Sequence, residues 1–320
     1  LWINATTFGW HMGVSDRDVY LHTLPQFHCN GWGMLYAVSA MGGKQVIIRK
    51  IDGHEILRRV DEHGVTLSCG APAVLNAVLD AAAELAADGK PIPGRHRVRI
   101  VVAGAPPPTT TIERTEVELG WEFVQIYGLT ETAPLLTINR NRAEYDDLTP
   151  NERAQKLARA GAPSFGTTMA VDDQGEILAR SNTVMAGYWQ QPDQTAAAIY
   201  DGFFHTGDGG IIDDDHYVVI SDRKKDVIIS GGENVSSIEV EDALFQHPDQ
   251  LELLRKQPSW IENATEELLR YDTPVQMTTK LATRDIPFHG RTIREGEAVT
   301  SLRGAVNRDP AKYVDPDRLD

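Results

Sequence analysis

Short apolar runs alternate with helix-like patterns through the first 240 residues of the chain. Strand-like apolar runs lie at residues 45–49, 65–69, 98–102 and 123–127. Residues 54–63 carry apolar side chains on one helical face, and the alanine-rich stretch 72–87 opens with a proline and is followed by Gly89, which is typical of a second helix. This alternation of strands and helices predicts an α/β fold with substantially parallel strand pairing.

The pattern changes after about residue 248, where we expect a boundary. Just before it, Ser236 and Glu239 fit a capping box that would start a helix running to about residue 245. Beyond it, residues 258–269 read as a helix and residues 287–299 as a short hairpin. The remainder is rich in Asp, Arg and Pro, and it predicts an irregular surface segment.

Composition limits the classes of partner. With 41% hydrophobic and 24% charged residues, the 320-residue chain has the composition of an ordinary globular protein. Its net charge of -15 argues against a nucleic-acid or anionic-membrane surface, because phosphates would be repelled. The two cysteines, Cys29 and Cys69, indicate reduced thiols and a cytoplasmic setting. No apolar run approaches the ~20 residues of a transmembrane segment, and no signal-peptide pattern is present.

Polar residues follow the last predicted strand, in the stretch YGLTET at 127–132. These side chains would lie at the carboxyl edge of the sheet, where α/β folds bind ligands. There Tyr127 could stack on adenine, Thr130 could bind a phosphate, and Glu131 could hold Mg2+ through a carboxylate oxygen. An ordinary polar loop remains the alternative for this stretch alone.

Two further polar positions could contact a nucleotide. Asp208, in FHTGD at 204–208, could accept hydrogen bonds from both ribose hydroxyls, and an ordinary turn Asp before two glycines is the alternative. The basic run at 223–225 is, taken alone, a solvated charged face.

Together these stretches form an ordered series. It comprises VAGAPPP at 102–108, YGLTET at 127–132, GEILARS at 175–181, GYW at 187–189, FHTGD at 204–208 and DRKKDVIISGGENV at 222–235. In order and spacing, residues 1–248 resemble the adenylate-forming acyl-CoA synthetases, and TLPQFHCNGWG at 23–33 is similar to the acyl-CoA and coumarate-CoA ligase branch. The resemblance implies an α/β ligase core that converts a carboxylic or fatty acid, ATP and CoA into acyl-CoA, AMP and pyrophosphate.

The resemblance also implies a role for each matching position. Residues contacting the nucleotide would be Gly104, Ala105, Pro106 and Tyr127 at the adenine, and Asp208 and Arg223 at the ribose. Thr130 would serve the phosphates and Glu131 the Mg2+, while His28 would lie near the acyl carboxylate, unless it is a packed histidine of an aromatic cluster. Lys225 would be the hinge between a large domain, 1–222, and the start of a mobile domain, 223–248. Gly231 and Gly232 would lie in the loop that approaches the pantetheine of CoA.

The sequence departs from that family in two places. It contains neither the Gly/Ser/Thr-rich phosphate loop upstream of residue 23 nor the C-terminal lysine that neutralises charge during adenylation. Since a backbone phosphate cradle and a positioned cation both stabilise the transition state, we expect impaired adenylation.

Residues 249–320 resemble a different family. The stretches that carry the resemblance are EELLRYDTPVQ at 266–276, RDIPFHGRTIREGEAV at 284–299, GAVNRDP at 304–310 and DPDRLD at 315–320. They resemble the C-terminal part of a bacterial cytochrome P-450, a haem–thiolate monooxygenase of mainly helical and irregular structure. This implies a salt-bridge network of Glu267, Arg270 and Arg318 behind the haem, with Lys280 near a haem propionate; a surface helix ion pair is the alternative for the first two.

The haem loop of that family has a cysteine, which residues 249–320 lack, so we expect no monooxygenase activity. The stretch LFQHPDQLELLR at 244–255 fits both families, and it favours a junction between two fragments. The function predicted from sequence is therefore an acyl-CoA ligase. The alternatives are a haem-dependent monooxygenase fragment and an inactive chimera that retains nucleotide binding.

Overall fold

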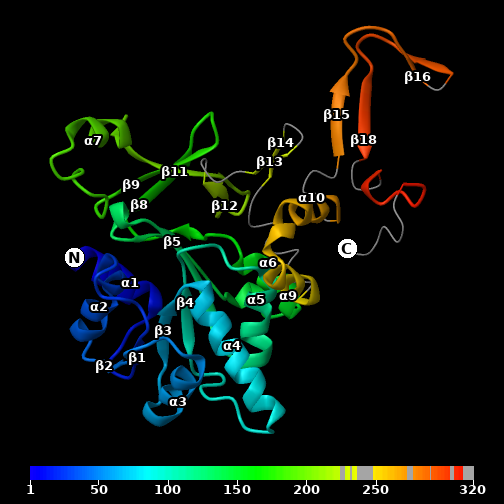
Figure 1. Ribbon diagram of the computed structural model, residues 1–320. Coiled ribbons are helices and arrows are strands. Elements are labelled where there is room, and N and C mark those ends of the chain that lie inside the picture. Colours follow the sequence, from blue (N-terminus) through cyan, green and yellow to red (C-terminus); the bar gives the residue numbers. More distant parts are fainter. Residues whose placement is uncertain are drawn as a thin grey trace. The chain divides into compact units, whose positions relative to one another are not determined.

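The computed structural model describes residues 1–223, 228–230, 233–235, 248–271, 277–288, 290–302 and 306–312. The chain divides into two compact units, Leu1–Asp226 and Val227–Asp320. Each unit is described by itself (Figure 1).

A seven-stranded sheet forms the centre of the first unit, in the order β2-β1-β3-β4-β5-β6-β7. Its strands are β1 (Val19–His22), β2 (Lys44–Ile47), β3 (Leu67–Gly70), β4 (Arg99–Val102), β5 (Glu122–Gly128), β6 (Leu135–Arg140) and β7 (Ala162–Pro163). Strands β1 to β5 pair in parallel, whereas β6 and β7 pair antiparallel. The α/β prediction with largely parallel pairing is confirmed.

Helices cover both faces of this sheet (Figure 1). In chain order they are α1 (Trp2–Met12), η1 (Cys29–Gly33), α2 (Met34–Ala40), α3 (Gly53–His63), α4 (Pro72–Ala87), α5 (Thr109–Arg114), η2 (Thr115–Leu119), η3 (Thr130–Thr132), η4 (Ala143–Tyr145) and α6 (Pro150–Leu157). The Asp52 side chain caps α3 by accepting from the Glu55 amide, and Gly64 ends that helix in the left-handed conformation. The two helices expected at 54–63 and 72–87 are thus confirmed.

Alternate residues of the strands face two separate cores. Leu21 of β1 packs with α3, α4, α5 and α6, while its neighbour Tyr20 packs with α1 and α2 on the opposite face. Val101 and Val102 of β4 divide between the two cores in the same way. This two-residue period explains why short, almost wholly apolar strands suffice for a sheet that is covered on both faces.

A second, smaller sheet completes the first unit. It has the order β10-β11-β9-β8, with β12 paired to β11. Its elements are β8 (Thr167–Val171), β9 (Glu176–Ser181), α7 (Pro192–Ala198), β10 (Ile199–Tyr200), β11 (Phe203–Ile212) and β12 (Val218–Arg223). Ile177, Ala179 and Val218 of this sheet pack against Leu136 of β6, so an apolar cluster joins the two sheets.

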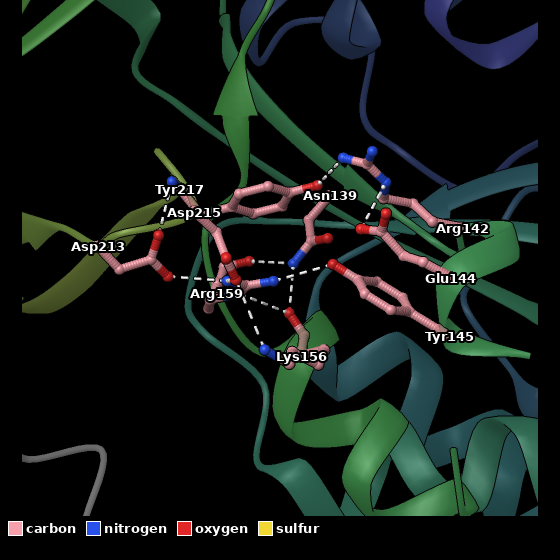
Figure 2. Close-up of polar contacts among 9 residues, drawn as sticks. All are labelled: Asn139, Arg142, Glu144, Tyr145, Lys156, Arg159, Asp213, Asp215 and Tyr217. Carbon is pink, nitrogen blue, oxygen red and sulfur yellow. Dashed lines mark hydrogen bonds and ion pairs between the residues drawn. The ribbon is translucent and has the colours of Figure 1, made fainter. Parts of the chain in front are cut away.

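Arg159 links the end of α6 to the turn between β11 and β12 (Figure 2). Its Nη1 donates to Asp213 and Asp215 at 2.8 Å each, and its Nη2 donates to the Tyr145 hydroxyl at 2.9 Å. The guanidinium also lies 4.0 Å from the centre of the Tyr217 ring. Arg159 is buried, and a buried positive charge is costly unless it is paired. The guanidinium therefore depends on these hydrogen-bond partners.

The second unit contains helices and short antiparallel strand pairs. Its described elements are β13 (Ile228–Ser230), β14 (Glu233–Val235), α9 (Pro248–Lys256), η5 (Pro258–Trp260), α10 (Ile261–Tyr271), β15 (Met277–Leu281), β16 (Ile286–Phe288), β17 (Arg291–Ile293) and β18 (Ala298–Leu302). The helix expected at 258–269 is present as η5 and α10. The capping-box helix expected from Ser236 lies outside the described residues.

The hairpin expected at 287–299 has a different extent from the prediction. Strands β16 and β17 form a tight pair, and β18 pairs with β15 instead of within the hairpin. The sequence pattern did not separate these pairs, because β15 reads MTTKL, with few apolar residues.

None of the helices that the structure describes, in either unit, is long and apolar enough to span a membrane.

Candidate functional site

Three of the predicted site loops begin where parallel strands end. The loop that contains His28 follows β1, the loop of Gly104 follows β4, and the turn of Thr130 follows β5. Because these strands run parallel, their carboxyl ends lie at one edge of the sheet. The site predicted from sequence therefore has a common edge on which to assemble.

The loop after β4 exposes backbone at that edge. Gly104 has φ +96°, and no atom lies within 4 Å of the position where a Cβ would stand. Gly104 and Ala105 are exposed, and Pro106 is half-buried. An open, side-chain-poor backbone of this kind allows a flat ring to approach closely.

Tyr127 and Asp208 meet although they are far apart in sequence. The Tyr127 hydroxyl donates to Asp208 Oδ2 at 2.7 Å. Asp208, on β11, is buried, and its amide donates to the Thr206 hydroxyl at 3.1 Å. The backbone of Asp208 pairs with that of Arg223 on β12, which puts both predicted ribose contacts on adjacent strands.

Gly128 permits the sharp exit from β5. The ladder between β5 and β6 shifts register between Tyr127 and Gly128. A Cβ on Gly128 would lie 1.5 Å from the Pro134 carbonyl oxygen, so only glycine fits this bulge. The turn then closes through Thr132, whose hydroxyl donates to the Pro134 carbonyl at 2.7 Å and accepts from the Leu129 amide at 2.9 Å.

Glu131 is oriented by a loop of the second sheet. The Tyr188 hydroxyl donates to Glu131 Oε1 at 3.0 Å, and the Met185 amide donates to the Glu131 carbonyl at 2.7 Å. Thr130 beside it is exposed. The role of Tyr188 was missed from the sequence, although the motif GYW at 187–189 was a usable signal.

The loop after β1 has an unusual backbone. Every residue of Cys29–Gly33 has positive φ, between 47° and 80°. Non-glycine residues adopt this left-handed region at a cost of roughly 1–2 kcal/mol each, and such strain concentrates at functional sites. The Asn4 side chain from α1 donates to the Trp32 carbonyl at 3.3 Å, and His28 next to the turn is exposed. The exposure argues against the packed-histidine alternative for His28.

The Cys29 thiol, in the loop after β1, interacts electrostatically with the Glu131 carboxylate. Burial, and then the Glu131 carboxylate, raise the pKa of the Cys29 thiol. The other thiol, Cys69, is fully buried between the sheet and α1, and burial raises its pKa to about 12. The loops after β1 and β5 therefore converge.

Glu131→Gln is expected to accelerate alkylation of Cys29 by iodoacetamide at pH 8 by roughly two- to threefold, because loss of the negative charge lowers the thiol pKa and increases the thiolate fraction. The amide oxygen can still accept from Tyr188, so the loop is preserved. Mass spectrometry of the labelled peptides measures the rate, with Cys69 as the unreactive internal reference. An unchanged rate would mean that Glu131 does not act on this thiol.

Some of the remaining predicted positions lie beyond the part of the chain that the structure describes. Lys225, Gly231, Gly232 and Arg318 lie outside the described residues, as do the side chains of Arg223 and Lys280. In the second unit, Arg270 donates to both carboxylate oxygens of Glu267 at 2.7 Å each, and to the Asn307 carbonyl at 2.9 Å. The predicted contact between Glu267 and Arg270 is therefore present, and it ties α10 to the segment that contains Asn307.

A family model described as AMP-binding enzyme matches residues 2–189. The chain is 42% identical over 255 residues to 2-methylpropanoate–CoA ligase CCL4 of Humulus lupulus, covering 75% of this chain and 44% of the relative. It is 36% identical over 294 residues to the peroxisomal trans-cinnamate:CoA ligase of Petunia hybrida, covering 84% and 49%. The chain thus spans about half the length of these curated relatives.

Solved structures agree with these matches. O-succinylbenzoate CoA synthetase of Bacillus subtilis, in complex with ATP and a magnesium ion, superposes with a TM-score of 0.65 at 26% identity, over 77% of this chain and 50% of that one. A Mycobacterium tuberculosis fatty acyl CoA synthetase gives a TM-score of 0.58 at 30% identity, over 77% and 48%.

Proposed function

Since the chain belongs to the AMP-binding enzyme family, we propose that it carries the nucleotide-binding part of an ATP-dependent acyl-CoA ligase. The reaction would join a monocarboxylic acid to CoA, with ATP converted to AMP and pyrophosphate. The acid class is suggested by the relatives named for 2-methylpropanoate and trans-cinnamate. One relative is named as peroxisomal, so the cytoplasmic location stays a prediction.

The hydrogen bond between Tyr127 and Asp208 is the observation that best supports this proposal. It joins the end of β5 to β11, so that the Tyr127 phenol ring and the buried Asp208 carboxylate are held next to each other. The Asp208 carboxylate would accept the ribose hydroxyls, while the Tyr127 ring stacks on the adenine that lies against Gly104, Ala105 and Pro106. A buried carboxylate held by a hydroxyl donor is pre-organised for such contacts.

Chemistry would occur at the α-phosphate. The acid carboxylate attacks it, pyrophosphate leaves, and the thiolate of CoA then displaces AMP from the acyl adenylate. Thr130, exposed at the turn after β5, would bind a phosphate oxygen, and His28 would orient the acid carboxylate from the strained loop after β1. Glu131 is partly exposed and offers the hard oxygen ligand that Mg2+ prefers, so its position fits this ion. When bound, Mg2+ would neutralise the charge on the leaving pyrophosphate.

Three positions would act later in the cycle by resemblance: Lys225 as the hinge and Gly231 and Gly232 at the pantetheine. They remain proposals that rest on their motif alone. The impaired adenylation expected from the sequence, and the chimera with residual nucleotide binding, also stay predictions.

A haem–thiolate site does not fit the residues of the second unit. Both cysteines of the sequence, Cys29 and Cys69, belong to the first unit, and residues 249–320 contain none. The monooxygenase resemblance of Glu267, Arg270, Lys280 and Arg318 stays a prediction, and no oxidative step follows from it.

Asp208→Ala is expected to weaken binding of AMP by tenfold or more, because the ribose loses a charged acceptor worth about 1.5–3 kcal/mol. Isothermal titration calorimetry with AMP, and with ATP and Mg2+, measures the affinity. Asp147→Ala, at an exposed position outside the site, is the matched control and should bind as the wild type does. Absence of binding at millimolar nucleotide, or equal affinity of the Asp208 variant, would contradict the proposed nucleotide site.

A second experiment tests the ligase reaction itself. It measures the release of pyrophosphate from ATP in the presence of CoA and a panel of monocarboxylic acids.

A further inference from the structure

Three metal-ligating side chains gather on the second sheet, on elements separate from the turn that carries Glu131. Asp172 follows β8, Glu176 begins β9, and His205 lies on β11 (Figure 1). One possible ligand atom from each lies within 4.8 Å of the other two. Among the described residues, this is the one group of three or more His, Cys, Asp or Glu side chains so arranged. None of the three has a role in the proposed reaction.

The imidazole of His205 is fixed but lacks a hydrogen bond on one nitrogen. Its ring stacks on Tyr200, with centroids 3.6 Å apart and planes inclined by 10°. The side chain is only 10% exposed. Its Nδ1 is buried without a hydrogen-bond partner, and it lies 3.9 Å from Glu176 Oε2. A buried nitrogen left in this state costs free energy unless something binds it, so its orientation toward Glu176 points to a ligand.

Both carboxylates are held in place by backbone amides. Asp172 Oδ1 accepts from the amides of Gln174 and Glu176 at 2.9 and 2.7 Å, which closes the turn between β8 and β9. Glu176 Oε1 accepts from the Gly207 amide at 2.8 Å. These hydrogen bonds orient both carboxylates toward the cluster.

We propose that Asp172, Glu176 and His205 bind one divalent transition-metal cation, such as Zn2+. One imidazole nitrogen and two carboxylate oxygens form a ligand set that suits such ions, and water completes the coordination. An all-oxygen set would instead favour Mg2+ or Ca2+. The ligand atoms lie within 4.8 Å of one another, and they have to move closer together to reach Zn2+ at about 2.0–2.2 Å.

The bound cation stabilises the segment that presents Asp208. It joins the turn between β8 and β9 to His205 of β11, three residues before Asp208, and Glu176 also accepts from the Gly207 amide. Since the ion binds the folded site and not the separated ligands, it raises the melting temperature of the first unit. This inference does not depend on the proposed reaction.

The test is metal binding by the chelator-treated, purified chain. We expect calorimetric titration with Zn2+ to give one site per chain, and Co2+ to give visible absorption bands of low-symmetry coordination. His205→Gln should weaken Zn2+ binding by at least roughly tenfold and abolish both the Co2+ bands and the rise in melting temperature. Asp172→Asn should also weaken Zn2+ binding. The amide oxygen of the asparagine can still accept the two hydrogen bonds of the turn, so weaker binding by this variant would not be explained by misfolding.

His216→Gln is the matched control, because His216 is an exposed histidine in the turn that follows β11. It should bind Zn2+ as the wild type does. The proposal is overturned if the wild type binds no Zn2+ at 100-fold molar excess. It is equally overturned if folded Asp172→Asn and His205→Gln proteins bind as tightly as His216→Gln.

Discussion

Gly128→Ala is expected to lower the free energy of unfolding by about 3–5 kcal/mol, a size reserved for substitutions that force the backbone to move. The new Cβ would lie 1.5 Å from the Pro134 carbonyl oxygen and 2.5 Å from its carbon. Both obstacles are backbone atoms, so no side-chain rotation relieves the clash. Urea denaturation followed by tryptophan fluorescence measures the effect, and loss of AMP binding should accompany it because Tyr127 is the adjacent residue.

Gly9→Ala is the matched control for this substitution. Gly9 lies within α1, and a Cβ there would meet only the Cβ of Ala37 at an ordinary 4.0 Å. Alanine in a helix interior is favoured over glycine by about 0.5–1 kcal/mol, so this variant should be slightly more stable than the wild type. A Gly128→Ala protein with wild-type stability would show that β5 and the Pro134 carbonyl do not approach as described.

The sequence predicted the elements whose side chains repeat with a clear period. Residues 54–63 have a strongly amphipathic pattern, and the helix α3 forms there with the expected apolar face buried. Strand β6 was missed because its buried positions include polar residues. Thr137 donates to the Ala160 carbonyl at 2.7 Å, and Asn139 donates to the Lys156 carbonyl at 2.8 Å. These buried polar side chains form their hydrogen bonds with residues that are distant in the sequence. A local sequence pattern cannot predict such partners.

The second sheet was missed for a related reason. Strand β11 reads FFHTGDGGII, in which three glycines and an aspartate interrupt the strand pattern. Asp208, the residue proposed to bind the ribose, was nevertheless singled out, since the motif around it was recognisable without the strand. The contact between Tyr127 and Asp208 spans 81 positions, so only the folded pairing of distant strands could reveal it.

Arg159→Met is expected to lower the free energy of unfolding by about 2–4 kcal/mol, because the network in Figure 2 loses the buried cation that contacts both Tyr145 and Asp213. Methionine fills similar space but leaves the Tyr145 hydroxyl and the Asp213 carboxylate without this donor. Lys156→Met is the matched control. Lys156 reaches Asp215 at 3.5 Å from an exposed position, and such pairs contribute about 0–1 kcal/mol.

The cost of Arg159→Met should also depend on pH in a defined direction. Burial opposes the charge on Asp213, yet the Arg159 guanidinium and the Tyr217 amide hold the pKa of Asp213 below its ordinary value. A carboxyl group with a lowered folded-state pKa stabilises the fold above its unfolded pKa of about 4, and this contribution is lost as the pH falls through the folded value. The difference in unfolding free energy between wild type and Arg159→Met should therefore be largest near pH 7 and shrink toward pH 3. Urea titrations across that range decide the matter. A difference that stays constant with pH would mean that packing of the arginine stem, and not its charge, stabilises this part of the first unit. A cost for Lys156→Met equal to that for Arg159→Met would mean that the buried ion pairs of Arg159 contribute no more than the exposed pair of Lys156.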